Sequence, residues 1–182
     1  MKNNILKSKF GFTLIETLVA ISILTAAIAG PLVLSIKSIG TASVSQDQLV
    51  AFYLGQEVIE YVRNVRDSNL IGKNLEDTSF DWLKGLLEYC EINGCYIDVV
   101  AENSQVTDCG SGGCVNKLKF DGKNYGYSLG VNSSFTRTVR ITNLVNSNAD
   151  EAQVDITMEW KSKYGNKKKT MELQDHIFNW RE

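Results

Sequence analysis

The chain of 182 residues contains a single histidine, His176, and a single proline, Pro31. One histidine cannot supply the histidine-rich ligand sets that hold zinc or iron at most catalytic sites. The 19 basic and 21 acidic side chains nearly balance, so the overall charge predicts no specific nucleic-acid partner. The sequence also lacks a glycine-rich phosphate loop, a Ser/His/Asp set and a catalytic pair of carboxylates. We therefore predict no enzyme, no cofactor and no metal.

Charge is also missing from a long segment near the N-terminus. Residues 12–36 carry one charged side chain, that of Glu16. As a helix this segment would be about 37 Å long, enough to cross a bilayer core of about 30 Å. It is too long for the apolar part of a secretory signal peptide, and no small-residue cleavage site follows it. Three lysines precede it and would hold the N-terminus in the cytoplasm, so the sequence predicts a single-pass span with an extracytoplasmic head.

The position of Glu16 requires an explanation. A carboxylate in the middle of a membrane helix costs about 2.5–3.5 kcal/mol, and less near the interface. Residues 11–16 read GFTLIE, after a short lysine-bearing leader and at the start of the apolar run. This pattern closely resembles the prepilin-type cleavage and methylation signal of type IV pilins and type II secretion pseudopilins. The resemblance covers residues 1–36.

The resemblance implies a role for each residue of the motif. A prepilin peptidase would cut between Gly11 and Phe12 and N-methylate the new terminus at Phe12. Glu16 matches the acidic residue at the fifth position of mature subunits, where it meets the terminal amine during assembly. Cleavage creates that amine four residues from Glu16, on the same face of the helix.

The resemblance further implies a subunit that is stored in the inner or plasma membrane and assembles with other pilin or pseudopilin subunits through its N-terminal helix. Gly30 and Pro31 are expected to kink or loosen this helix. Major pilins usually have their proline two residues further along, which favours a minor pilin. A type II secretion or competence pseudopilin is the first alternative, and a membrane-anchored binding protein that never assembles is the second.

The rest of the chain predicts an α+β head behind the helix. Apolar side chains recur at helical spacing between Leu49 and Val65, so the second half of the helix should pack on the head. A loop and a short helix are expected in residues 67–88, followed by antiparallel strands. The predicted strands are 96–100, 115–120, a weaker 125–130, and a meander of 135–142, 154–161 and 171–177. The predicted divisions are a cleaved leader (1–11), a transmembrane half-helix (12–36), an amphipathic half-helix (37–66) and the head (67–182).

Four cysteines lie close together in the sequence, at Cys90, Cys95, Cys109 and Cys114. In an extracytoplasmic head disulfides persist, so we predict two disulfides, for which three pairings are possible. A zinc site with four thiolates is the alternative.

Two groups of polar residues on the predicted surface are open to two interpretations each. Asn146, Asn148 and Asp150 alternate oxygen ligands, which hints at calcium, although a surface turn accounts for the same residues. One hairpin carries several lysines, which are typical of a protected strand edge and also of a basic binding surface. They are Lys161, Lys163, Lys167, Lys168 and Lys169. His176 is predicted to be a surface or boundary side chain.

Overall fold

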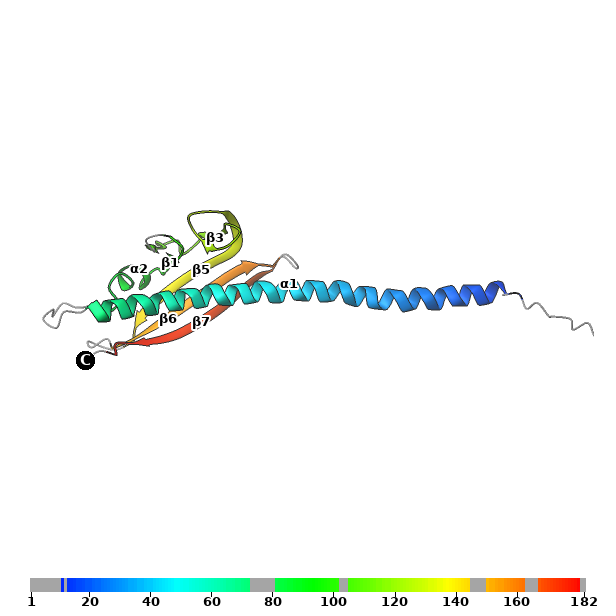
Figure 1. Cartoon of the computed structure of the whole chain (residues 1–182), viewed down its shortest axis with the longest axis horizontal. Helices are drawn as coiled ribbons and strands as arrows, with labels where there is room; N and C mark the ends of the chain where they lie inside the picture. The colour runs from blue at the N-terminus through cyan, green and yellow to red at the C-terminus, as the bar shows by residue number, and fades with distance from the viewer. Residues whose placement is uncertain are drawn as a thin grey trace, which may run out of the picture. The chain divides into compact units, whose positions relative to one another are not determined.

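The computed structural model of the chain describes residues 11, 13–72, 81–101, 105–144, 150–162 and 167–180 (Figure 1). It consists of one long helix, one short helix and a seven-stranded antiparallel sheet, which confirms the predicted α+β class. The chain divides into two compact units, Met1–Ser43 and Val44–Glu182. We call the second unit the head.

The long helix, α1, spans Leu14–Gly72. Its first turn is capped by Thr13, whose side-chain oxygen accepts the backbone N–H of Glu16 at 3.3 Å. A threonine followed three residues later by a glutamate is a common way to begin a helix, because it satisfies free backbone donors. Pro31 lies inside the helix, which continues through it.

The helix ends later than predicted, at Gly72 instead of near Arg66. The extra turns are held by the segment that follows. Leu70 is fully buried, and the side-chain amide of Asn69 donates to the carbonyls of Trp82 and Lys84 at 3.1 and 3.0 Å. Trp82 itself is buried. The short helix α2, Leu87–Cys90, completes this part of the head.

The sheet is organised around its longest strand, β5 (Val131–Asn143). One edge of β5 pairs with β6 (Glu151–Lys161), which pairs in turn with β7 (Lys168–Phe178). This is the predicted three-stranded meander, with each strand longer than expected. The other edge of β5 pairs with β1 and β3. The remaining strands are short: β1 Cys95–Asp98, β2 Gln105–Asp108, β3 Lys117–Phe120 and β4 Tyr125–Gly126.

The core of the head lies between the sheet and the second half of α1 (Figure 1). Buried residues recur along the helix at 51, 54, 55, 58, 59 and 62, one face of a 3.6-residue period. Gly55 allows a close approach of the helix to β7, since a Cβ atom there would lie 2.6 Å from Leu173 Cδ1 and the leucine side chain would have to shift. Further along, Arg63 Nε donates to Asp175 at 3.1 Å and Trp180 Nε1 to Asp67 at 3.1 Å. Within the head, α1 and β7 therefore run in the same direction.

Candidate processing and assembly site

The N-terminal segment exposes the glycine of the predicted cleavage position. Gly11 is exposed, and a Cβ atom built on it would have no neighbour within 4 Å. No described side chain therefore crowds this glycine. Residues 1–10 and Phe12 lie outside the described residues, so cleavage after Gly11 and methylation of Phe12 remain predictions.

Glu16 lies in the first turn of α1 and is exposed. The positive end of the helix dipole favours a carboxylate at this position. None of the ion pairs among the described residues includes Glu16. The acid is thus placed on the surface of an apolar helix, where a cation from another terminus or another chain could reach it.

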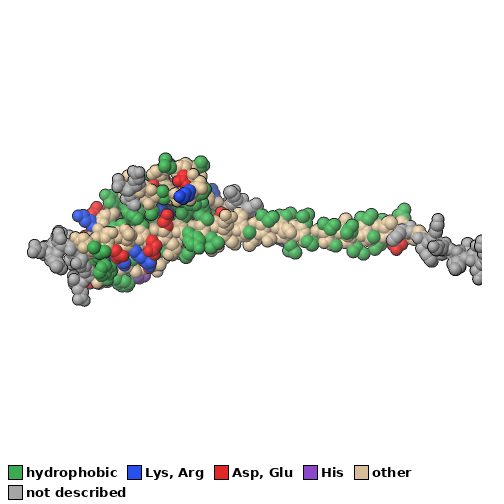
Figure 2. All heavy atoms as spheres, in the orientation of Figure 1, with side chains coloured by type: hydrophobic (Ala, Val, Ile, Leu, Met, Phe, Trp, Pro, Cys, Tyr) green, Lys and Arg blue, Asp and Glu red, His purple; other side chains and the backbone are tan. Residues whose placement is uncertain are grey.

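The hydroxyl groups of the apolar segment are satisfied within the helix itself. Thr17, Ser22, Thr25 and Ser35 each donate to a backbone carbonyl three or four residues earlier, at 2.8–3.0 Å. In a bilayer every polar group needs such a partner, since water is absent. Large apolar side chains cover the surface of this segment (Figure 2). Among the described residues, α1 is the one helix long and apolar enough to cross a membrane.

The head contains a buried arginine that the sequence analysis overlooked. Arg137 lies on the inward face of β5 with 0% of its surface exposed. Its Nη1 donates to the carbonyl of Leu54 at 2.8 Å and to Glu57 Oε2 at 3.0 Å, and its Nη2 donates to the carbonyl of Ile97 at 2.7 Å. One side chain therefore connects α1, β1 and β5. An arginine at an inward position of an alternating strand is the signal that could have revealed it.

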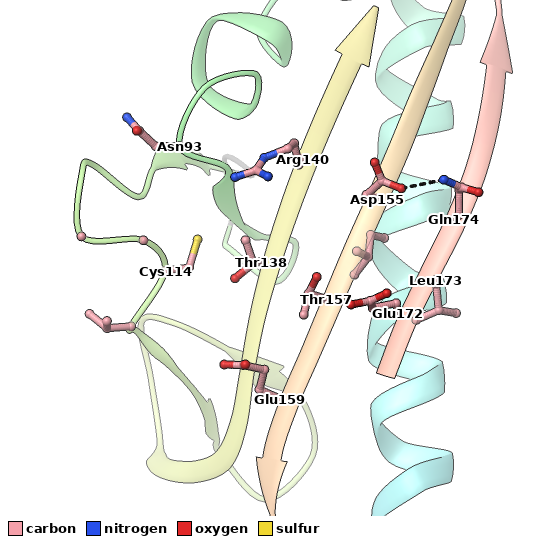
Figure 3. Close-up of a pocket in the computed structure, with 14 residues that line it drawn as sticks. Asn93, Cys114, Thr138, Arg140, Asp155, Thr157, Glu159, Glu172, Leu173 and Gln174 are labelled. Carbon is pink, nitrogen blue, oxygen red and sulfur yellow. Dashed lines mark hydrogen bonds between the residues drawn. The ribbon is translucent and has the colours of Figure 1, made fainter. Parts of the chain in front are cut away.

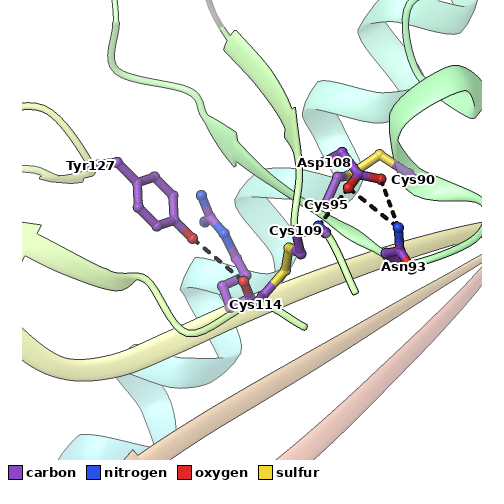
Figure 4. Close-up of a disulfide and its surroundings, with 9 residues drawn as sticks. Cys90, Asn93, Cys95, Asp108, Cys109, Cys114 and Tyr127 are labelled. Carbon is purple, nitrogen blue, oxygen red and sulfur yellow. Dashed lines mark hydrogen bonds between the residues drawn. A yellow bond between two sulfur atoms is a disulfide. The ribbon is translucent and has the colours of Figure 1, made fainter. Parts of the chain in front are cut away.

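A buried carboxylate fixes the segment beside this arginine. Asp98 accepts the backbone N–H of Tyr127 at 3.1 Å and the hydroxyl of Ser128 at 2.8 Å. The Tyr127 hydroxyl donates to the carbonyl of Arg137 at 3.5 Å (Figure 4). Burial raises the pKa of Tyr127, so its hydroxyl stays protonated and able to donate. These groups stabilise the head and show no arrangement for catalysis.

Both predicted disulfides are present, and the pairing left open by the sequence is local. Cys90 bonds to Cys95 and Cys109 to Cys114 (Figure 4). The two loops are also joined directly, because Cys109 N–H donates to the carbonyl of Gly94 at 3.0 Å. Among the described residues no group of three or more His, Cys, Asp or Glu side chains is placed to hold a metal ion.

Asp150 and His176 lie at the surface of the head. Asn146 and Asn148 lie outside the described residues, so the calcium hypothesis remains untested. Asp150 accepts the side-chain amide of Asn179 at 3.2 Å and its backbone N–H at 2.8 Å. His176 lies on β7 at the surface, with its Nδ1 2.7 Å from Glu151 Oε1.

A polar cavity of about 730 Å³ lies on the outer face of the sheet, under the loop that contains Cys114 (Figure 3). Arg140 and Glu172 line it, together with Asp155, whose carboxylate accepts the side-chain amide of Gln174 at 3.0 Å. Asp155 is thus held by an amide and is not paired with a nucleophile or a base. The polar side chains give this face of the sheet a hydrated surface.

These features define the class of the protein: an α+β head behind an apolar helix that can cross a membrane, with an exposed glycine and an unpaired acid at the start of that helix. The family model described as the prokaryotic N-terminal methylation motif matches residues 6–30. The chain therefore carries the prepilin-type cleavage and methylation segment that marks the type IV pilin and pseudopilin family. No curated protein and no solved structure gives a significant match.

Proposed function

We propose that the chain is a minor pilin-like structural subunit of a type IV pilus. Prepilin peptidase cuts between Gly11 and Phe12 and N-methylates Phe12. The mature subunit is stored in the inner or plasma membrane, with its head on the extracytoplasmic side, and then enters the fibre through its N-terminal helix. The observation that carries the proposal is the lone acid Glu16, at the start of an apolar helix and five residues after Gly11.

Cleavage supplies the cation that Glu16 lacks. The new amine of Phe12 stays charged after methylation, and a carboxylate surrounded by lipid gains greatly from a nearby cation. Cleavage also removes Lys2, Lys7 and Lys9, the charges that would hold the helix in the cytoplasmic interface. The same step therefore creates the docking group and frees the subunit for extraction from the bilayer.

A type II secretion or competence pseudopilin would use the same segment in the same way. Pro31 favours a minor pilin, because major pilins have their proline further along the helix. The distinction concerns the fibre in which the subunit is placed and leaves the chemistry of Gly11, Phe12 and Glu16 unchanged.

The first test is processing. Co-expression with a prepilin peptidase should shorten the chain by its first 11 residues and leave N-methyl-phenylalanine at the terminus, as measured by intact mass. Gly11→Ala should process poorly and serves as the control. If the membrane form keeps its full length, the proposal fails and the non-assembling anchored protein replaces it.

The second test separates assembly from anchoring. Glu16→Val removes the charge, and Glu16→Gln keeps the size of the side chain without the charge. In both variants we expect normal cleavage and a normal membrane level, while the amount in sheared fibres falls at least about tenfold. Normal incorporation of both variants would show that the ion pair does not drive docking. Loss of the protein from the membrane would assign Glu16 to insertion instead.

A further inference from the structure

The lysines of the head are gathered at one end of it. The strand registers place Lys117 beside Thr136, Thr136 beside Glu159, and Lys161 beside Lys168. The β3–β4 turn follows Lys119 and Phe120, which pair with Asn132 and Val131 at the start of β5. We call this group the basal lysines: Lys117, Lys119, Lys123, Lys161, Lys167, Lys168 and Lys169. Among the described residues of the head, Lys84 is the only other lysine.

Few acids neutralise this end. Glu159 pairs with Lys168 at 2.7 Å, and the other carboxylates that the described residues place here are Asp121 in the β3–β4 turn, Asp98 beside β4 and Asp47 on α1. Burial and, second, the charge of Asp47 raise the pKa of Tyr125, which places Asp47 near the β3–β4 hairpin. The seven basal lysines against these four carboxylates leave three positive charges in excess on a chain whose total charge is −2. The far end of the head carries several acids, including Asp67, Asp150 and Glu151.

The basal lysines lie where the chain enters the head. Gly55 of α1 lies against Leu173 of β7, and Asp67, about three turns later in α1, is hydrogen-bonded to Trp180, just after β7. The hairpin between β6 and β7 therefore lies beside the first turns of α1 in the head. Only residues 37–43 separate this entry point from the apolar run, and as a helix they span about 10 Å. That length is close to the Debye length of about 8 Å in physiological salt.

A cavity of about 420 Å³ at the same end offers room for a small anionic group. Three basal lysines line it: Lys117, Lys161 and Lys168. The hydroxyls of Ser134 and Thr136 line it as well and can donate hydrogen bonds to an anion. The carboxylate of Glu159 also lines it and is paired with Lys168. Ammonium and hydroxyl groups around a concave surface match the phosphate of a lipid headgroup.

We propose that the basal lysines bind the headgroups of anionic phospholipids and hold the head on the membrane while the subunit is stored. Lysines close to an anionic membrane surface gain from its negative potential, and the chain's own apolar segment brings them within range. This position favours lipid over nucleic acid, because lipid headgroups lie next to a membrane helix, whereas a nucleic-acid surface could lie anywhere on the head. The inference rests on the membrane-inserted state of the proposed function and not on cleavage or assembly.

The test uses the full chain in lipid nanodiscs and compares pure phosphatidylcholine with an equal mixture of phosphatidylcholine and phosphatidylglycerol. Lysines are labelled with an amine-reactive ester, and each site is quantified by peptide mass. In the anionic discs we expect the labelling rate of the basal lysines to fall by about threefold to fivefold, and to recover in high salt. Lys84 should label equally in both lipids and is the control within the same molecule.

A charge variant sharpens the result. The triple variant Lys161→Gln/Lys168→Gln/Lys169→Gln should lose most of the protection at Lys117, whereas Lys84→Gln should retain it. Equal labelling of the basal lysines in both lipids would overturn this inference and leave the proposed function intact. A chain that does not co-purify with the discs would overturn both. Protection by duplex DNA in neutral discs, without protection by phosphatidylglycerol, would overturn it in favour of a nucleic-acid surface.

Discussion

The two units of the molecule place their apolar side chains in opposite environments. In the first unit, Leu14 and Leu34 are 82% and 69% exposed, whereas in the head Val58 and Ile141 are 0% exposed. The head therefore has a core of its own. Among its described residues the first unit has none, and so large an exposed apolar surface is typical of a site that contacts lipid or other proteins. Because the head has its own core, the membrane storage and assembly that we propose would not require the head to unfold.

The polar groups differ as well. In the first unit the hydroxyls of Ser22 and Thr25 donate hydrogen bonds to carbonyls of their own helix, so these bonds do not connect different elements. In the head, Arg137 and Asp98 bond to elements far away in the sequence. Replacing one of these polar side chains by an apolar one should therefore lower the free energy of unfolding strongly in the head and only slightly in the first unit.

The largest effect is expected for Arg137→Met. The substitution removes three buried or partly buried hydrogen bonds, to the carbonyls of Leu54 and Ile97 and to the carboxylate of Glu57, and so breaks the link between α1, β1 and β5. Loss of one member of such a buried network typically lowers the free energy of unfolding by about 3–5 kcal/mol. Chemical denaturation of the detergent-solubilised chain, followed by tryptophan fluorescence, measures it.

The control for this prediction is Arg140→Met on the outer face of the same strand. Arg140 is exposed, so its replacement should change the free energy of unfolding by no more than about 0.5 kcal/mol. If the two variants were equally stable, Arg137 would not link the helix to the sheet. Polar side chains would then matter less to the stability of the head than the comparison of the two units implies.

The same arginine shows how far the sequence could predict the fold. Alternation of apolar and polar residues located the β5–β6–β7 meander correctly, because one face of each strand is buried. Arg137 breaks that alternation, and the reason lies in backbone carbonyls of α1 and β1 that only the folded chain brings together. Strand β2 was missed because it is only four residues long and its side chains are not fully buried. The end of α1 was placed too early because its last turns depend on Trp82 and Lys84 of the next segment.

The predicted N-terminal site, unlike Arg137, depends on consecutive residues and not on the folded structure. Gly11, Phe12 and Glu16 were predicted from six consecutive residues and their context, because the cleavage signal that they resemble is a continuous stretch of sequence. No tertiary contact is needed to define such a site. The basal lysines could be only partly anticipated, because their clustering depends on the register of β3, β5, β6 and β7.

Removal of a disulfide is expected to lower the free energy of unfolding less than Arg137→Met does. Comparing the two disulfides distinguishes the contribution of loop closure from that of burial. Both bridges join cysteines five residues apart, so each should stabilise the head by about 2 kcal/mol through loop closure. Cys90 and Cys95 are fully buried, whereas the Cys109–Cys114 bridge is partly exposed. Cys90→Ala/Cys95→Ala should therefore be more destabilising than Cys109→Ala/Cys114→Ala, because it also leaves a cavity.

Denaturation of the two double variants under the same conditions measures the difference. A common value for both would show that loop closure alone accounts for the stabilisation. A greater loss for Cys109→Ala/Cys114→Ala would show that the outer loop organises the sheet beneath it, contrary to the burial argument.

The smallest effect is expected for Ser22→Ala and Thr25→Ala in the apolar helix. Each hydroxyl donates only to carbonyls of its own helix, which already accept backbone hydrogen bonds, so its removal leaves no group unsatisfied. Hydrogen bonds of side chains in membranes contribute about 0.6 kcal/mol on average, and alanine also favours the helix slightly. We expect unchanged membrane level, cleavage and thermal stability, measured beside Glu16→Val. A variant that is cleaved and inserted normally but is depleted from sheared fibres would show that these hydroxyls change partner during assembly. The first unit would then contribute polar contacts between subunits as well as apolar surface, and Glu16 would no longer be the sole polar group in its docking.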